Sequence, residues 1–140
     1  SMRSGIDNLR SFWDDRGLAI AGAIFKDGSG LSRGNSLSAR QLARMLAKIG
    51  RDQSIFEPFF ASLPIAGQSG TLKKVLSGTP AEGKVVAKSG SMGRVRAYAG
   101  YISTRSGKQL AFAIMADRFV GENWLVQREL ERILLELYQL

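Results

Sequence analysis

Residues 83–92 read Gly-Lys-Val-Val-Ala-Lys-Ser-Gly-Ser-Met. This stretch is a short apolar run that ends in a lysine, a hydroxyl residue and a glycine. It predicts a strand over residues 84–88, with Lys88 at the exposed end. Two further strands are expected at 95–104 and 108–116, because Arg105-Ser106-Gly107 between them is a hairpin signal. The three strands should form an antiparallel meander.

Three helices are expected beside this sheet. Residues 5–16 carry apolar side chains at steps of three and four, and Gly17 follows in the usual C-cap position. A second helix begins at Ser38, which has a glutamine three residues later as in a capping box, and ends at Gly50. The last helix, capped by Asn123, carries one apolar stripe and should lie across the sheet.

The remaining segments are shorter. We expect a short apolar strand at residues 19–25, a short helix and a packed turn at 54–66, and one or two helical turns at 71–76. This order predicts an α+β fold, an antiparallel sheet packed against helices that include a C-terminal helix. A single domain portion should cover residues 1–140, with Ser1-Met2 as a cloning scar.

The sequence contains neither cysteine nor histidine. This excludes disulfides, thiolate nucleophiles, a Ser-His-Asp triad and metal sites built on cysteine or histidine. Any acyl-transfer chemistry would have to use lysine as its base. We therefore expect no bound metal and no cofactor.

The chain carries a net charge of +8. Most of the cations are dispersed without interleaved aromatic residues, which argues against a nucleic-acid partner. However, Arg40, Arg44 and Lys48 lie four apart on the second predicted helix, and Arg51 follows. This row is either a solvated helix face or a phosphate-contacting surface. An alternative function is therefore a non-catalytic basic module that binds nucleic acid or an anionic polymer.

The segment from Lys88 to Ser91 could bind a peptide that ends in a free carboxylate. Lys88 supplies positive charge, Ser89 offers a hydroxyl donor, and Gly90 lets a peptide lie close to the strand. The strand edge could pair with the peptide main chain, and the Ser91 N–H could stabilise a developing oxyanion. The alternative is a plain strand end, in which an exposed lysine precedes a turn.

Three other segments extend this pattern into a family resemblance. Residues 27–33 read Asp-Gly-Ser-Gly-Leu-Ser-Arg, residues 64–67 read Pro-Ile-Ala-Gly, and residues 95–102 form the strand after the Lys-Ser-Gly motif. In this order they resemble the D-alanyl-D-alanine carboxypeptidase/endopeptidase family typified by penicillin-binding protein 4. This family comprises the class C penicillin-binding proteins, or S13 peptidases. Ser89 stands where the family usually has threonine, and it keeps the hydroxyl.

The resemblance implies the C-terminal part of a penicillin-binding or β-lactamase-like transpeptidase domain. Lys88, Ser89 and Gly90 would be the third catalytic motif, and the Ser91 N–H would be half of the oxyanion hole. The residues that would border the pocket for the stem-peptide side chain are Ser29, Leu31, Arg33 and Met92. The local alternative is a glycine-rich turn shaped by Asp27.

Two motifs of the resembled family do not occur here. No serine has a lysine three residues later, and no asparagine has a serine two residues before it. We therefore expect the nucleophile upstream of residue 1, in the missing N-terminal part of the same protein, and this chain to be inactive alone. The parent would be a serine-type D-Ala-D-Ala carboxypeptidase that cleaves peptidoglycan stem peptides through an acyl-enzyme.

The resemblance also sets expectations about partners and location. The parent would act on stem peptides that end in D-Ala-D-Ala, would be acylated by β-lactams, and would work in the periplasm or otherwise outside the cytoplasmic membrane. A degenerate relative that only binds cell-wall peptide remains a third possibility. An incomplete sheet would expose an edge, which favours self-association or an added partner segment.

Overall fold

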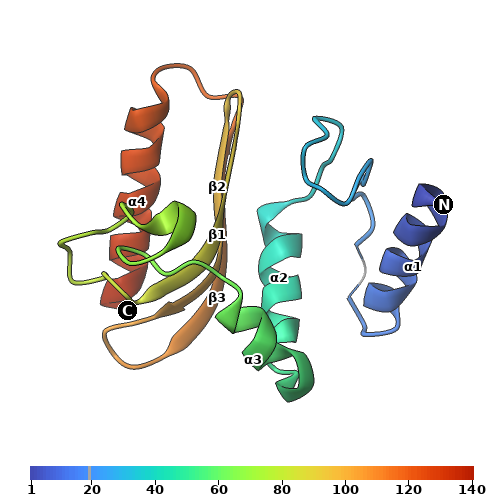
Figure 1. Ribbon diagram of the computed structural model, residues 1–140, viewed down its shortest axis with the longest axis horizontal. Coiled ribbons are helices and arrows are strands. Elements are labelled where there is room, and N and C mark those ends of the chain that lie inside the picture. Colours follow the sequence, from blue (N-terminus) through green and yellow to red (C-terminus); the bar gives the residue numbers. More distant parts are fainter. Residues whose placement is uncertain (19) are drawn as a thin grey trace.

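The computed structural model describes residues 1–18 and 20–140 (Figure 1). It contains four α-helices, one 3₁₀ helix and three strands in the part of the chain that is described. Their bounds are α1 Met2–Asp14, α2 Ala39–Ile49, α3 Gln53–Ala61, η1 Gly70–Leu72, β1 Val85–Met92, β2 Val95–Ser103, β3 Gln109–Asp117 and α4 Asn123–Gln139.

The three strands form one antiparallel sheet in the order β1-β2-β3, which confirms the predicted meander. The pairing of β1 with β2 continues past Lys88, through Gly90 opposite Ala97, to Met92 opposite Val95. Strand β1 is therefore four residues longer at its C-terminal end than predicted. As a result, the segment Lys88–Ser91 lies inside the ladder, with its backbone fixed by β2.

Helices cover both faces of the sheet (Figure 1). Helix α4 lies across one face, where Leu130 and Leu134 pack against Val85, Ala87 and Ile102. Leu134 and Ile102 are fully buried, and burial of each such side chain stabilises the fold by about 1.5–3 kcal/mol. This apolar layer holds β1 in place and confirms the predicted position of the C-terminal helix.

Tyr101 connects the opposite face of the sheet to α2 and α3. Its buried hydroxyl donates a hydrogen bond of 2.8 Å to the carbonyl of Leu46 in α2. Its ring contacts Phe56 edge-on and lies 5.8 Å, centroid to centroid, from Phe60 in α3. Burial raises the pKa of the Tyr101 hydroxyl to about 12, so it remains a donor at neutral pH.

Helix α1 forms an outer layer on α2 (Figure 1). Trp13 and Ile20 form a small core with Met45 and Ile49 of α2. The helix begins and ends a few residues earlier than the predicted 5–16, at Met2 and Asp14, but Gly17 still closes the following turn in the left-handed region at φ +70°. The next N–H, that of Leu18, donates 2.9 Å to the carbonyl of Trp13, which is the Schellman closure that glycine favours.

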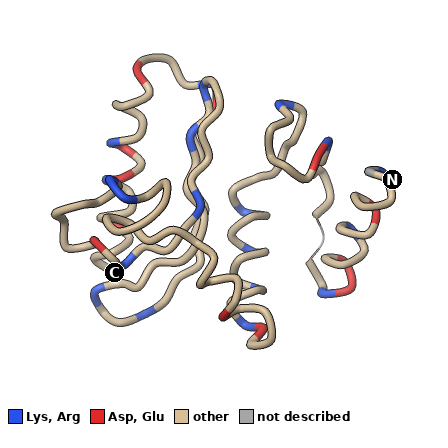
Figure 2. The backbone as a smooth tube through the Cα atoms, viewed as in Figure 1, with Lys and Arg blue, Asp and Glu red and all other residues tan. Residues whose placement is uncertain are grey.

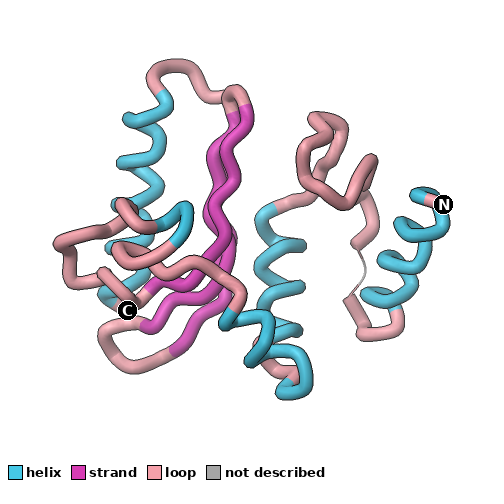
Figure 3. Tube along the Cα trace, viewed as in Figure 1, coloured by secondary structure: helices cyan, strands magenta, loops and turns pink. Residues whose placement is uncertain are grey.

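The predicted strand at 19–25 is wrong for the residues that the structure describes, and Ala19 lies outside them. Residues 20–25 form a turn and a loop (Figure 3). The turn is closed by a hydrogen bond of 3.0 Å from the Ala23 N–H to the Ile20 carbonyl, and Gly22 has a φ of +81°. Ile24 forms one isolated bridge with Ser36. An apolar run becomes a strand only beside a partner strand, and here none extends along it.

Two boundaries also differ from the prediction. Glu122, one residue before the predicted Asn123, is the N-cap of α4, and it forms no capping side-chain bond. The predicted helical turns at 71–76 are limited to η1, and turns follow it. In contrast, the capping box of Ser38 and Gln41 and the C-cap at Gly50 are present. Figure 2 shows the cations spread over all the layers.

The Tyr101 contact predicts a measurable loss of stability. Tyr101→Phe keeps the ring but removes the hydroxyl, so the free energy of unfolding in urea should fall by about 1 kcal/mol. The matched control is Tyr138→Phe, because no hydrogen bond of that hydroxyl is found among the described residues. Since the folded pKa of Tyr101 exceeds the unfolded value of 10.0, its contribution is complete below pH 10 and is lost as the pH rises through the folded pKa. An equal effect of both substitutions would contradict this role.

Candidate active site

A cavity of about 820 Å³ lies between the loop at residues 27–35 and the C-terminal half of β1. This size suits a small ligand or a peptide end. All eight residues that the sequence singled out line it. The complete lining is Ser29, Gly30, Leu31, Ser32, Arg33, Asn35, Lys88, Ser89, Gly90, Ser91, Met92, Gly93, Arg94, Val95, Asp117 and Arg118. The structure thus brings together two motifs that are more than fifty residues apart in the sequence.

The outer edge of β1 is paired over only half of its length. The Ala66 N–H donates to the Val85 carbonyl at 2.9 Å, and the Ala87 N–H donates to the Pro64 carbonyl at 3.0 Å. Backbone groups alternate in direction along an antiparallel strand. Ser89 and Ser91 therefore direct their N–H and C=O groups to the same side as Val85 and Ala87, where no described segment pairs with them.

Lys88 and Ser89 lie at the start of this open edge. The exposed Lys88 ammonium donates to the Ser89 carbonyl at 2.5 Å, and the Ser89 hydroxyl donates to the Thr71 hydroxyl at 2.8 Å. Because Thr71 accepts in this pair, its own proton remains available to an incoming ligand. The edge therefore offers the Lys88 ammonium group and the hydrogen-bonded hydroxyls of Ser89 and Thr71. These groups lie beside backbone N–H groups with which no described segment pairs.

The facing loop is organised around Asp27. Its carboxylate accepts bonds from the Asn35 amide at 2.7 Å, the Ser29 hydroxyl at 2.9 Å, the Ser32 N–H at 2.9 Å and the Gly30 N–H at 3.2 Å. These donors, Asn35 above all, lower the pKa of Asp27 below its ordinary value. The Ser29 hydroxyl thus faces Asp27, whereas Leu31, which is 74% exposed, and Arg33 remain free to meet a ligand.

The sequence interpretation did not assign Thr71, Arg94, Asp117 or Arg118 to the site. The Arg94 guanidinium donates to the carbonyls of Phe119 at 2.5 Å and Arg118 at 2.7 Å, which ties the β1–β2 turn to the end of β3. Asp117 pairs with Val95, so the hairpin register could have placed it at this end of the sheet. Nothing in the sequence pointed to the contact of Thr71 with Ser89.

Positive charge predominates around the cavity. Arg33, Lys88, Arg94 and Arg118 line it against one carboxylate, Asp117. Asp117 lies 3.6 Å from Arg118 in an exposed ion pair, which stabilises little. Among the described residues, no group of three or more acidic side chains could hold a metal ion. The arrangement suits an anionic ligand with an extended backbone.

A sequence model of the D-Ala-D-Ala carboxypeptidase 3 (S13) family matches residues 1–134. The chain belongs to the S13 family. This confirms the family resemblance that the motifs indicated.

Curated relatives and solved structures agree with this assignment. The chain is 38% identical over 123 residues to a D-alanyl-D-alanine carboxypeptidase of Actinomadura sp. (strain R39), covering 84% of this chain and 22% of that protein. A carboxypeptidase of Mycobacterium tuberculosis is 37% identical over 84% of this chain and 26% of its own length. The chain thus spans about a quarter of the length of these relatives.

Penicillin-binding protein 4 of Haemophilus influenzae has the same fold. One crystal structure matches all of this chain with a TM-score of 0.86 and 28% identity. The match covers 33% of the chain in that crystal structure. A second, complexed with a novel β-lactam, matches with a TM-score of 0.87 and 25% identity. The predicted α+β fold, as a part of a penicillin-binding domain, is therefore confirmed.

Loss of the Asp27 carboxylate should loosen the loop at residues 27–35 that faces β1. In Asp27→Asn, the amide protons of Gly30 and Ser32 should exchange several times faster than in the parent chain, as measured by NMR. Because the pKa of Asp27 in the folded chain lies below its ordinary value of 3.8, protection should be complete at neutral pH and should decrease as the pH falls through the folded pKa. Asp7→Asn on α1 is the charge-matched control, and equal exchange in both variants would contradict the account.

Proposed function

We propose that this chain is the C-terminal part of a serine-type D-Ala-D-Ala carboxypeptidase or endopeptidase that acts on peptidoglycan stem peptides. The observation that supports it most is the open edge of β1 inside a basic cavity, with Lys88, Ser89 and Ser91 along it. Family membership and the named carboxypeptidase relatives agree with this proposal. Residues outside these 140 would supply the nucleophile, in a Ser-x-x-Lys motif.

In this proposal, the substrate lies antiparallel to β1 as an added strand. Its terminal carboxylate accepts from the hydroxyl pair of Ser89 and Thr71, and Lys88 supplies a positive charge beside it. Gly90 leaves room for the peptide backbone at this point. These contacts would hold the scissile carbonyl at a fixed place along the strand.

The chemistry follows from that placement. The serine hydroxyl attacks the carbonyl carbon of the penultimate D-Ala, and the Ser91 N–H donates to the oxyanion that develops. The C–N bond then breaks, the terminal D-Ala leaves with a proton on its amine, and water hydrolyses the acyl-enzyme. Lys88 tunes the electrostatic surroundings of the nucleophile. Without the serine, the chain alone keeps only binding and oxyanion contacts and is inactive.

The side chain of the preceding stem-peptide residue would lie against the loop wall. Ser29, Leu31 and Arg33 form that wall, and Met92 closes it from β1. Asp27 acts on this pocket only through the loop that it holds in shape.

The proposal also covers partners and location. β-Lactams would acylate the parent protein, which would work in the periplasm or elsewhere outside the cytoplasmic membrane. In the described part of the chain, no helix is long and apolar enough to cross a membrane. The N-terminal part of the same protein would be the natural partner of the sheet. When that part is absent, the outer edge of β3, which pairs with no described strand, would favour self-association.

Fluorescent penicillin tests the proposal directly. The longer protein that carries this chain should become covalently labelled, whereas residues 1–140 alone should not, because the acylated serine is absent from them. Labelling is read on a denaturing gel with and without excess unlabelled β-lactam. A longer protein that folds but does not label would contradict the proposal, and so would labelling of the isolated chain.

Substitutions at Ser89 test the role of its hydroxyl in the longer protein. Ser89→Ala should slow penicillin labelling by about tenfold, because one hydrogen bond to a charged group is lost. Ser89→Thr should stay within about twofold of the parent rate, since it keeps the hydroxyl. Ser103→Ala, at the exposed end of β2, is the control and should label at the parent rate. Equal rates for the alanine and threonine variants at position 89 would exclude the carboxylate contact.

A further inference from the structure

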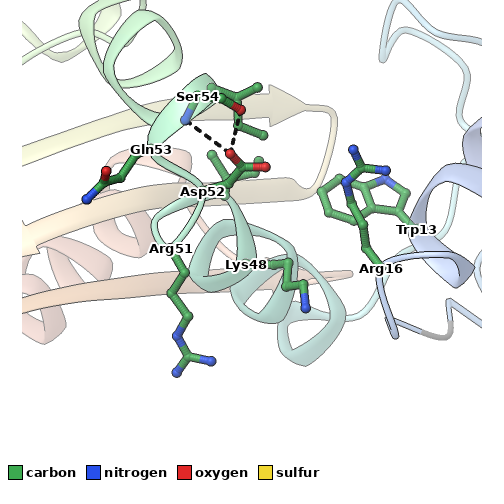
Figure 4. A pocket seen from close by; sticks show the side chains of 9 residues that line it. Trp13, Arg16, Lys48, Arg51, Asp52, Gln53 and Ser54 are labelled. Carbon is green, nitrogen blue, oxygen red and sulfur yellow. Dashed lines mark hydrogen bonds between the residues drawn. The ribbon is translucent and has the colours of Figure 1, made fainter.

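A second cavity, of about 550 Å³, lies where α1 ends and the turn between α2 and α3 begins (Figure 4). Two of its charged side chains are already engaged. The Arg16 guanidinium lies 3.6 Å from the centre of the Phe12 ring and donates to the Phe12 carbonyl, and Asp52 caps α3 by accepting from Ser54. The C-terminal ends of α1 and α2 meet the N-terminal end of α3 here, so their dipoles oppose one another. This cavity therefore favours no ligand of either charge.

The end of the β1–β2 hairpin, beside the candidate active site, is held differently from the rest of the sheet. None of the residues from Lys88 to Ala97 is buried, whereas the other half of β1 packs against α4. Pairing with β2 sets the register of this end, but strand pairing without packing of a face is only marginally stable. Contacts other than apolar packing must therefore fix its position.

The hairpin turn contains only Gly93 and Arg94. Met92 and Val95, directly before and after them, pair with each other. Gly93 has a φ of +54°, whereas Arg94 is not among the residues with a positive φ. This pattern is typical of a type II′ turn, which favours glycine at its first central position. Such a tight turn leaves the backbone of Arg94 little freedom, so a contact of its side chain holds the ends of both strands.

Arg94 reaches from this turn to the segment that follows β3. Its Nε donates to the Phe119 carbonyl at 2.5 Å, and its Nη2 donates to the Arg118 carbonyl at 2.7 Å. Consecutive carbonyls of an extended strand point in opposite directions. One guanidinium reaches both here because the chain changes direction at Arg118, which has a φ of +53°. This left-handed conformation is strained for a residue with a side chain, and the planar fork of Arg94 matches the two carbonyls that it brings together.

Ser91 lies two residues before this turn, in the half of β1 that carries no buried side chain. Its N–H points to the open edge, where no described segment pairs with it. In the proposed reaction this N–H donates to the developing oxyanion, and such a donor must lie about 3 Å from the oxygen. In contrast, Lys88 and Ser89 adjoin the half of β1 that residues 64–66 and α4 hold. Movement of the hairpin end would therefore displace the oxyanion donor more than the carboxylate contacts.

We infer that Arg94 is a positioning residue for the proposed acyl transfer, an inference that rests on the proposed function. By tying the hairpin turn to the carbonyls of Arg118 and Phe119, Arg94 keeps the Ser91 N–H at the place where the oxyanion develops. Arg94 also lines the cavity, but its Nε and Nη2 are occupied by the backbone, so it acts through the turn rather than on the ligand. Its loss should slow the acylation step and leave the affinity for the ligand unchanged.

Penicillin labelling of the longer protein separates these two effects. When the labelling rate is followed against penicillin concentration, Arg94→Ala should lower the maximal rate by about tenfold. The half-saturating concentration should stay within about twofold of the parent value. Arg94→Lys should not restore the rate, because lysine keeps the charge but replaces the planar fork by a single ammonium. A higher half-saturating concentration with an unchanged maximal rate would show direct ligand binding and overturn the inference.

Arg105→Lys is the matched control. Arg105 lies in the β2–β3 hairpin, at the opposite end of the sheet. It donates to the Gln139 side chain at 3.4 Å and does not line the cavity. This variant should label at the parent rate. An equal loss of rate in Arg105→Lys and Arg94→Lys would show a general effect of arginine replacement and would also overturn the inference.

Hydrogen exchange in the 140-residue chain tests the contact without any ligand. In Arg94→Lys, the Met92 amide, which faces β2 beside the turn, should exchange several times faster than in the parent chain. The Val86 amide, in the packed half of the same ladder, should exchange at the parent rate. Unchanged exchange at Met92 would mean that Arg94 does not hold the hairpin end.

The failure of this inference and the failure of the peptidase proposal are distinguishable. A longer parent protein that does not label overturns the peptidase proposal. A parent that labels, together with Arg94 variants that label at the same maximal rate, overturns only the role of Arg94.

Discussion

The outer edge of β1 loses its partner after Ala87, and the candidate site depends on that loss. The pairing segment begins at Pro64, directly after α3 has ended at Ala61. The N–H of Leu63 is already used by the Phe60 carbonyl, and Pro64 has no N–H to donate. The paired segment therefore cannot extend along Lys88–Met92. The sequence around Pro64 thus leaves Lys88–Met92 open to an extended ligand.

An open edge is useful for binding only if it is rigid, and here β2 makes it so. Every residue of β1 from Val85 to Met92 is in register with β2, and α4 packs the buried half of β1 from one face. The opposite wall is fixed differently, by the four hydrogen bonds that Asp27 accepts within its own loop. One wall is held by a sheet and the other by a single carboxylate, so the loop is the more easily perturbed of the two.

Local signals in the sequence predicted most of the fold. The capping box at Ser38, the glycine after α1 and the hairpin at residues 105–107 depend on backbone chemistry within a few residues, and all appear as expected. The segment at 19–25 was mispredicted because strand formation requires a partner from elsewhere in the chain, which a local pattern does not reveal. The additional length of β1 has the same cause, because pairing with β2 extends the strand to Met92.

In the candidate site, too, local sequence predicted some features, whereas others depend on contacts between distant parts of the chain. The residues quoted from the two motifs do share one cavity, although their roles remain proposals. Asp117 could have been placed from the hairpin register, since it pairs with Val95. Thr71 could not, because its contact with Ser89 depends on how the turns after η1 return the chain to β1. Tertiary contacts of this kind carry no periodicity or spacing that a single sequence displays.

The most direct test of the central claim is an NMR titration of the isotopically labelled chain with a peptide that ends in D-Ala-D-Ala. If the open edge of β1 binds such a peptide as an added strand, the amide signals of Ser89 and Ser91 should shift, and the isomer that ends in L-Ala-L-Ala should shift them much less. If these two amides do not respond while the chain is folded, or if both isomers shift them equally, the edge is not a site for a D-amino-acid terminus.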